Sequence, residues 1–199
     1  MPQVSEREFR ALPLRVHQFL ADVPLHDVWV VDLPCARAGI TLDEFLRRTG
    51  DRLFTPSPAG RVLLEIRWFV GRLLGWDRDR TTSNPSSDSA PTFADRLTPG
   101  DRARSLATPG TCDGPFCVVY RFENEQLGEV LNRTVHAAAL SALQETANGY
   151  RFYFAVYVRN VSRLTPLYMT LIDPFRKLIV YPSLLRSVRR NWARTIAAT

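Results

Sequence analysis

The chain has 199 residues, 45% of them hydrophobic, which is enough to bury a substantial core in a single domain spanning 1–199. Its net charge of +6 comes almost entirely from arginine, since Lys177 is the only lysine, and arginine spread along a chain gives weak support for nucleic-acid binding. No stretch approaches a membrane span and no secretory signal pattern opens the chain, so we expect a cytoplasmic protein without a transmembrane segment.

The cysteines and histidines do not show the spacing of a metal centre. Cys35, Cys112 and Cys117 are odd in number and lack a C-x-x-C pair, which argues against a disulfide framework or a structural zinc site. A bond between Cys112 and Cys117 would require an oxidising compartment. The three histidines form no H-x-x-x-H or H-E-x-x-H pattern. We therefore expect neither a metal nor a cofactor.

A short helix and a strand are predicted at the start of the chain. Residues 1–23 carry a short amphipathic pattern that Pro24 closes. Residues 25–33, LHDVWVVDL, are rich in β-branched and aromatic residues, which favours a strand.

Two short helices are predicted after this strand. Thr41 and Glu44 form a capping box, so a helix begins there and runs to about Thr49. A second helix extends over residues 57–75, from a Ser-Pro pair to a glycine. This order excludes a Rossmann unit, which needs a Gly-rich turn and a parallel strand.

Residues 77–114 are crowded with Ser, Thr, Asp, Pro and Gly. Such a composition buries too little apolar surface to offset its ordering entropy, so we expect a largely mobile insertion. A functional lid is the alternative for a loop of this length. Only Phe93, Leu97 and Leu106 offer apolar side chains for packing.

The stretch from residue 115 to residue 161 predicts an antiparallel meander. Residues 115–123 alternate between two faces, and 127–134 run with little or no break into 135–146. Asn148-Gly149 is a strong hairpin signal before the aromatic strand 150–161.

A long C-terminal helix is predicted over residues 164–195. Thr165 caps it, and Pro174 and Pro182 kink or break it, because each removes one backbone hydrogen bond. We therefore expect a bent helix in two or three pieces. Its apolar stripe, which would lie across the sheet, is predicted to contain Leu167, Leu171, Phe175, Leu178 and Leu185.

Strand, two helices, meander and terminal helix is the order of the helix-grip fold, in which a curved antiparallel sheet wraps around the last helix. Three stretches carry a closer resemblance: LPLRVHQFLADVPLHDVWVVDLP (12–34), NRTVHAAAL (132–140) and LTPLYMTLIDPFRKLIVYP (164–182). They resemble an uncharacterised bacterial domain-of-unknown-function family similar to SRPBCC (START-like) proteins. The resemblance implies an α+β helix-grip fold with a cavity for an apolar or amphipathic small molecule, and it supplies no catalytic residues.

The strand 150–161 has one purely apolar side and one mixed side. Tyr153, Tyr157 and Arg159 lie on the mixed side and could orient a ligand if that side faces the cavity. Alternatively, these amphipathic side chains cover the outer face of the sheet.

His136 is a candidate acid, base or ligand contact, because its ordinary pKa lies near neutrality. A histidine alone on a strand is more often a hydrogen-bonded structural residue, unless a carboxylate orients it. The possible partners across the sheet are Glu123, Glu125 and Glu129.

Asp173 precedes Pro174 in the terminal helix. Its carboxylate could accept hydrogen bonds from backbone donors exposed by the kink, or pair with Arg121 or Arg159. Tyr168 and Tyr181 could line the cavity or belong to the core. Asp173 and Tyr168 complete the set of expected ligand contacts.

The end of the terminal helix is strongly basic and carries interleaved apolar residues. Such a helix suits a membrane surface or an anionic partner. The plainer interpretation is that cations complement the negative end of the helix dipole. No nucleic-acid-binding motif accompanies the charge, so we expect no nucleic-acid partner.

Three hypotheses follow from these patterns. The preferred one is a domain that binds a hydrophobic or amphipathic small molecule between sheet and terminal helix. The second is an enzyme of cyclase, hydrolase or dehydratase type that uses His136 with a tyrosine or carboxylate. The third is a peripheral membrane or partner-binding protein that acts through its basic C-terminal helix.

Overall fold

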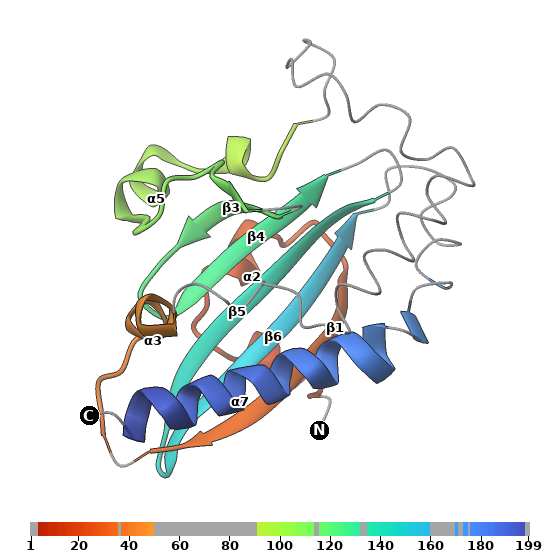
Figure 1. Cartoon of the computed structure of the whole chain (residues 1–199). Coiled ribbons are helices and arrows are strands. Elements are labelled where there is room, and N and C mark those ends of the chain that lie inside the picture. The colour runs from red at the N-terminus through yellow and green to blue at the C-terminus, as the bar shows by residue number, and fades with distance from the viewer. Residues whose placement is uncertain are drawn as a thin grey trace.

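The computed structural model describes residues 4–35, 37–49, 91–113, 116–131, 135–159, 170, 173–174 and 176–197. The expected helix at 57–75, most of the first turns of the terminal helix, and Tyr168 lie outside these residues. Within them, an antiparallel sheet is covered on both faces by short helices and by one long C-terminal helix (Figure 1). This arrangement confirms an α+β fold.

In the described residues the sheet has six strands in the order β1-β6-β5-β4-β3-β2, and every neighbouring pair is antiparallel. The first and last of the described strands, β1 and β6, therefore lie side by side. The strands are β1 (Leu25–Pro34), β2 (Cys112–Asp113), β3 (Phe116–Arg121), β4 (Glu125–Leu131), β5 (His136–Thr146) and β6 (Gly149–Arg159).

The predicted meander is confirmed in its hairpin and wrong in one junction. Thr146 pairs with Gly149, so β5 and β6 form the expected hairpin. Gly149 has φ +132°, and a Cβ there would lie 2.5 Å from the Cys35 nitrogen, so only glycine fits. However, β4 and β5 do not run on continuously. Leu131 pairs with His136, so the chain reverses between them.

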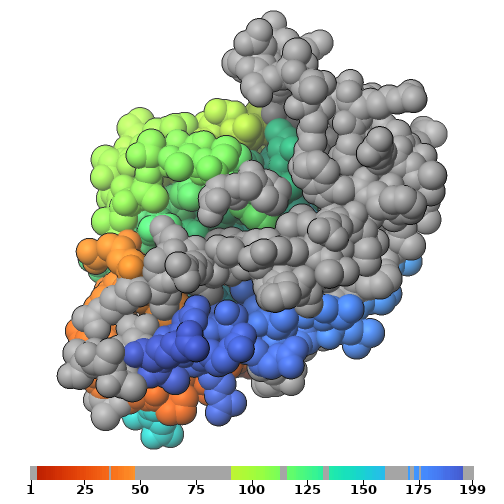
Figure 2. All heavy atoms as spheres, viewed as in Figure 1, coloured from red at the N-terminus to blue at the C-terminus, as the bar shows by residue number. Residues whose placement is uncertain are grey.

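The apolar side of β6 packs under the terminal helix. In its described part from Arg176 onward, this helix consists of a π-helical turn, η2 (Arg176–Val180), followed directly by the α-helix α7 (Tyr181–Ala197). Pro182 lies in the first turn of α7, where it needs no hydrogen bond, and does not interrupt the helix. Figures 1 and 2 show α7 running across one face of the molecule.

The packed stripe of the helix differs from the predicted one. Leu185 is fully buried, but Leu178 is 76% exposed, because the helix changes type before Tyr181 and this shifts the buried face. The buried side chains of α7 are Tyr181, Leu185, Val188 and Trp192. Trp192 packs against the ring of Phe45 in a tilted arrangement. Phe45 belongs to α3 (Leu42–Thr49), the helix that Thr41 caps as predicted.

Short helices cover the opposite face of the sheet. They are α1 (Glu6–Arg10), α2 (Val16–Phe19) and the 3-10 turn η1 (Ala94–Arg96). Phe9, Phe19 and Phe93 are buried and pack against aromatic rings on the sheet. The sheet is therefore the middle layer between two apolar clusters.

The described part of the predicted mobile segment is folded. Residues 91–113 form η1, α5 (Pro99–Arg104) and β2, with Phe93 and Leu97 buried and Leu106 exposed. Backbone hydrogen bonds also join residues 106–111 to the outer edge of β3: Leu106 N–H donates to the Arg121 carbonyl (2.7 Å) and Gly110 N–H to the Val118 carbonyl (2.7 Å). Residues 77–90 lie outside the described ranges.

Cys112 and Cys117 form a disulfide between the paired strands β2 and β3, against the expectation from cysteine count. The two residues face each other in the register, which brings their sulfurs together. Such bonds are typical of oxidising compartments, so the cytoplasmic location stays a prediction.

Candidate functional site

A cluster of polar side chains lies where the start of β1 meets the start of the terminal helix. The register of β1 against β6 shifts between Leu25 and Asp27, leaving His26 as an extra residue. Such a bulge redirects side chains. The side chains of His26 and Asp27 consequently both approach the terminal helix, with His26 Nε2 3.8 Å from Asp27 Oδ2.

Asp27 is the unusual member of this cluster. Its side chain is 0% exposed, yet neither carboxylate oxygen accepts a hydrogen bond in the structure as described. The nearest cation on the helix is Arg176, whose Nη2 lies 3.9 Å from Oδ2. Burial raises the pKa of Asp27, and the attraction of Arg176 and His26 only partly opposes this. A buried carboxyl without a hydrogen-bond partner lowers the stability of the folded state by about 1–3 kcal/mol.

Trp29 adds a second buried polar atom without a partner. It lies two residues after Asp27 on β1, so both side chains belong to the face covered by the terminal helix. The indole Nε1 is buried and finds no acceptor among the described residues. The Trp29 ring packs against Tyr181, with 5.4 Å between centroids, and Tyr181 in turn packs against Phe154. A donor and an acceptor thus lie beside an aromatic wall.

Asp173 and its partners fix the helix side of the cluster. The Asp173 carboxylate contacts His26 Nε2 (3.0 Å to each oxygen), Arg176 Nη1 (3.1 Å) and Lys177 Nζ (3.2 Å). Burial acts to raise the pKa of Asp173, but these donors outweigh it and hold the pKa below its usual range. The expected partners, Arg121 and Arg159, are therefore not the ones observed.

Tyr181 completes the cluster through its contacts with Arg176. Arg176 Nη2 donates a hydrogen bond to the Tyr181 hydroxyl, and the guanidinium carbon lies 5.2 Å from the centroid of the tyrosine ring. Burial raises the pKa of Tyr181, so its hydroxyl stays neutral. The cluster therefore combines His26, Asp27, Trp29, Asp173, Arg176 and Tyr181.

The candidate catalytic residue His136 lies on the other face of the sheet. It is 1% exposed, stacks on Phe93 with 3.8 Å between centroids, and contacts Glu129 (Nε2 to Oε2, 2.8 Å). Glu129 also accepts backbone hydrogen bonds from Phe93 (2.8 Å) and Ala94 (3.2 Å). Glu129 is thus the predicted carboxylate partner of His136. Both groups hold η1 against the sheet, which agrees with the alternative that His136 is a hydrogen-bonded structural residue.

Three other predicted ligand contacts also lie away from the terminal helix. Tyr153 and Tyr157 are buried in the apolar cluster under α1 and α2, and Arg159 lies at the end of β6 on the same side. Burial raises the pKa of Tyr157, whose hydroxyl has no partner among the described residues. Of the predicted ligand contacts that the structure describes, only Asp173 belongs to the polar cluster. A signal for Asp27 was present, since an ionisable residue inside an apolar strand needs a partner.

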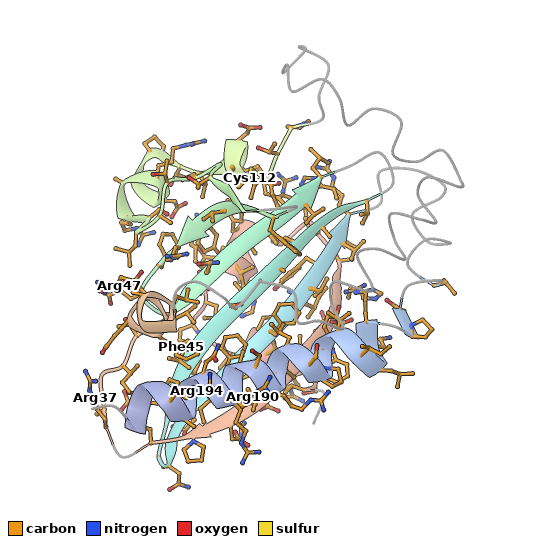
Figure 3. The ribbon with its side chains drawn as sticks, viewed as in Figure 1. Arg37, Phe45, Arg47, Cys112, Arg190 and Arg194 are labelled. Atoms are coloured by element: carbon orange, nitrogen blue, oxygen red, sulfur yellow. A yellow bond between two sulfur atoms is a disulfide. The ribbon has the colours of Figure 1, made fainter. Side chains whose placement is uncertain are left out.

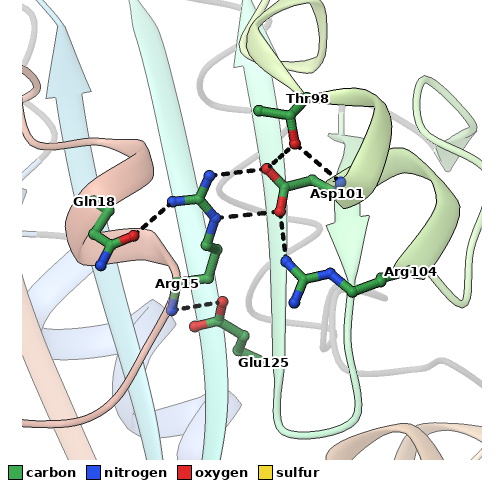
Figure 4. A network of polar contacts seen from close by, with 6 residues as sticks. All are labelled: Arg15, Gln18, Thr98, Asp101, Arg104 and Glu125. Carbon is green, nitrogen blue, oxygen red and sulfur yellow. Dashed lines mark hydrogen bonds and ion pairs between the residues drawn. The ribbon is translucent and has the colours of Figure 1, made fainter.

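A second polar network joins the N-terminal segment to α5 (Figure 4). Arg15 binds the Asp101 carboxylate through Nε (3.2 Å) and Nη2 (2.9 Å), and Thr98 and Arg104 donate to the same carboxylate (2.8 and 2.7 Å). The hydrogen bond from Arg15 contributes most to lowering the pKa of Asp101. This carboxylate is fully partnered, so the network holds the fold together.

Glu125 lies beside this network and is only half satisfied. Its Oε1 accepts a hydrogen bond from the Arg15 backbone N–H (3.0 Å), while Oε2 is buried without a partner in the described chain. Burial raises the pKa of Glu125 to about 7. The nearby Tyr120 hydroxyl acts to lower the pKa of Glu125, but its position does not meet the geometry of a hydrogen bond.

Neither a metal centre nor a membrane span is apparent in these parts of the chain. Among the described residues, no group of three or more His, Cys, Asp or Glu side chains could hold a metal ion. No helix in the same residues combines the length and apolarity needed to cross a bilayer.

Comparison with known proteins connects the chain to one family. No curated protein and no solved structure matches the chain significantly. The family model described as "Protein of unknown function (DUF2867)" matches residues 19–183, which include the polar cluster and all the described strands of the sheet. The chain therefore belongs to the DUF2867 family, whose function is unknown.

Proposed function

We propose that this protein binds a small amphipathic molecule between its sheet and its terminal helix, in a helix-grip arrangement like that of SRPBCC proteins. The observation that carries the proposal is the pair Asp27 and Trp29: a buried acceptor and a buried donor, both without a hydrogen-bond partner in the described chain, beside the rings of Tyr181 and Phe154. Small-molecule sites are mostly apolar, with a few polar groups that orient the ligand.

The polar groups define the chemistry of the ligand. Asp27 would accept a hydrogen bond from a hydroxyl or amine, and Trp29 Nε1 would donate to an oxygen next to it. Because the pKa of Asp27 is raised, an uncharged ligand head suits the site better than an anionic one. An apolar body would pack on the aromatic wall formed by Tyr181 and Phe154.

The hypothesis of an enzyme based on His136 receives less support. Glu129, its only observed carboxylate contact, already accepts two backbone hydrogen bonds, and Phe93 covers the ring. A general base needs access to the proton that it removes. Binding at the Asp27 cluster is therefore the function that we favour.

The test compares two substitutions on one strand. Asp27→Asn removes the buried carboxylate that accepts no hydrogen bond from the described residues, whereas Asp32→Asn removes an exposed carboxylate from the same strand and serves as the matched control. Native mass spectrometry of protein purified from its own cells should show a small molecule bound to the wild type and to Asp32→Asn, and much less bound to Asp27→Asn.

A defined probe gives an independent reading. 1-Decanol, a neutral hydroxyl on an apolar chain, should raise the melting temperature of the wild type and of Asp32→Asn more than that of Asp27→Asn. The proposal is wrong if the wild type carries no small molecule and does not respond to this probe.

A further inference from the structure

The positive charge of this chain is concentrated at its C-terminal end. Residues 174–199 contain six cationic side chains and no acidic one, so this segment carries a charge equal to the net +6 of the whole chain. The remaining arginines are balanced by acidic residues in number. The apparent spread of arginine along the sequence therefore hides a local imbalance.

Three of these cations form a line on the outside of α7. Arg186, Arg190 and Arg194 are spaced four residues apart, which places them on one side of the helix, and all three are exposed. We call these three residues the arginine row; Figure 3 labels two of them, Arg190 and Arg194, along α7. None of the three forms an ion pair with another described residue, whereas the exposed Arg37 and Arg47 are paired with Glu44 and Asp43.

The buried side of α7 cannot serve a partner, because it is already used by the sheet. Tyr181, Leu185 and Val188 are buried in the core. The arginine row therefore remains as an outward surface on a helix whose orientation is fixed by packing. Figure 2 shows α7 as a continuous strip on one face of the molecule.

Exposed apolar side chains stand at the start of the same helix. Leu178 is 76% exposed and Ile179 40% exposed, and among the described residues only Leu106 is a comparable exposed large hydrophobic side chain. A nucleic acid or an acidic peptide would satisfy the arginines but would make little use of two aliphatic side chains. A lipid surface satisfies both, since its headgroups take the cations and its acyl region takes the aliphatic groups.

We propose that the outer face of the terminal helix, formed by the arginine row with Leu178 and Ile179, docks on a bilayer that contains anionic phospholipids. Guanidinium groups bind phosphate through paired hydrogen bonds, and each cation near such a surface contributes about 1 kcal/mol, or about fivefold in affinity. This docking is independent of the ligand site around Asp27.

The experiment is sedimentation of the full chain with vesicles. The wild type should bind vesicles of mixed phosphatidylserine and phosphatidylcholine, and added salt should weaken that binding. Vesicles of phosphatidylcholine alone should bind much less. Failure of the wild type to bind the mixed vesicles would overturn the proposal.

Charge-matched variants separate a specific face from overall charge. Arg190→Gln with Arg194→Gln should weaken vesicle binding by about 30-fold, since two contacts are lost. Arg7→Gln with Arg10→Gln removes the same charge from exposed positions on α1, on the opposite side of the sheet, and should have a much smaller effect. Equal losses in the two double variants would contradict docking through α7.

Leu178→Ser distinguishes a lipid surface from other polyanions. It should weaken binding to the mixed vesicles and leave binding to heparin, which has no apolar interior, unchanged. Heparin or duplex DNA binding that depends on the arginine row, without vesicle binding, would assign the face to a polyanion and not to lipid. Circular dichroism and melting curves confirm that each variant is folded.

Discussion

Glu129 and Asp27 are both buried carboxylates, but they lie on opposite faces of the sheet in opposite surroundings. Glu129 accepts hydrogen bonds from two backbone N–H groups and contacts His136. Asp27 accepts none from the described residues. Burial alone therefore does not identify a functional group. The number of hydrogen bonds separates Glu129, which holds the fold together, from Asp27, for which we propose an external partner.

The largest effect is expected at Glu129. Glu129→Ala leaves two buried N–H groups and a buried histidine without their acceptor, so it should lower the free energy of unfolding by about 3–5 kcal/mol. Urea unfolding followed by circular dichroism measures this loss. Glu145→Ala, an exposed site on the neighbouring strand β5, should change stability by less than about 0.5 kcal/mol. If Glu129→Ala lowers the free energy of unfolding by less than about 1 kcal/mol, Glu129 does not hold the fold together and the proposed difference from Asp27 is wrong.

Glu125 tests the intermediate case, in which only one oxygen is satisfied. Its folded pKa of about 7 lies above the unfolded value of 4.5, so the folded state holds the proton more tightly. Stability from this group is present below pH 4.5 and is lost as the pH rises to about 7. Glu125→Gln does not ionise and should be more stable than the wild type by about 1–3 kcal/mol at pH 8.

The pH dependence of that difference is the decisive measurement. Urea unfolding at pH 8 and at pH 4 should show the gain from Glu125→Gln at the higher pH and little or none at the lower. An equal gain at both pH values would mean that packing, and not ionisation, causes it.

The smallest effect is expected at Asp27. Because folding raises the pKa of Asp27, ionisation of this group destabilises the folded state, and Asp27→Asn should stabilise the unliganded protein by about 1 kcal/mol at pH 8. Asp32→Asn should change stability by less than about 0.5 kcal/mol. Thermal melts of ligand-free protein compare the two. Clear destabilisation by Asp27→Asn would show that the carboxylate has a structural partner.

The sequence predicted the strands and the hairpin better than it predicted which segments pack on the faces of the sheet. Period-two alternation correctly separated the two sides of β6, and Gly149 correctly placed the hairpin. The reversal between Leu131 and His136 was missed, because the residues between them include no glycine or proline. The folding of residues 91–113 depends on Glu129 and Arg15, which are distant in sequence and invisible to a composition argument.

The candidate site was predicted only in part, for a similar reason. Asp173 was identified from its place beside Pro174, but its partner His26 is 147 residues away. The tyrosines of β6 were predicted as ligand contacts on the condition that their side of the strand faces the terminal helix. Short N-terminal helices cover that face, which alternation within one strand cannot reveal.

The hydrogen bonds between residues 106–111 and β3 have a consequence for the behaviour of the protein at high concentration. An open strand edge offers unpaired amides and carbonyls to another chain, and this is a common route to fibrils and other insoluble assemblies. The Leu106 and Gly110 amides already occupy carbonyls along this edge, and the Cys112–Cys117 bond tethers the covering segment to the strand. Reduction of that bond would loosen the cover and expose a template for intermolecular β-pairing.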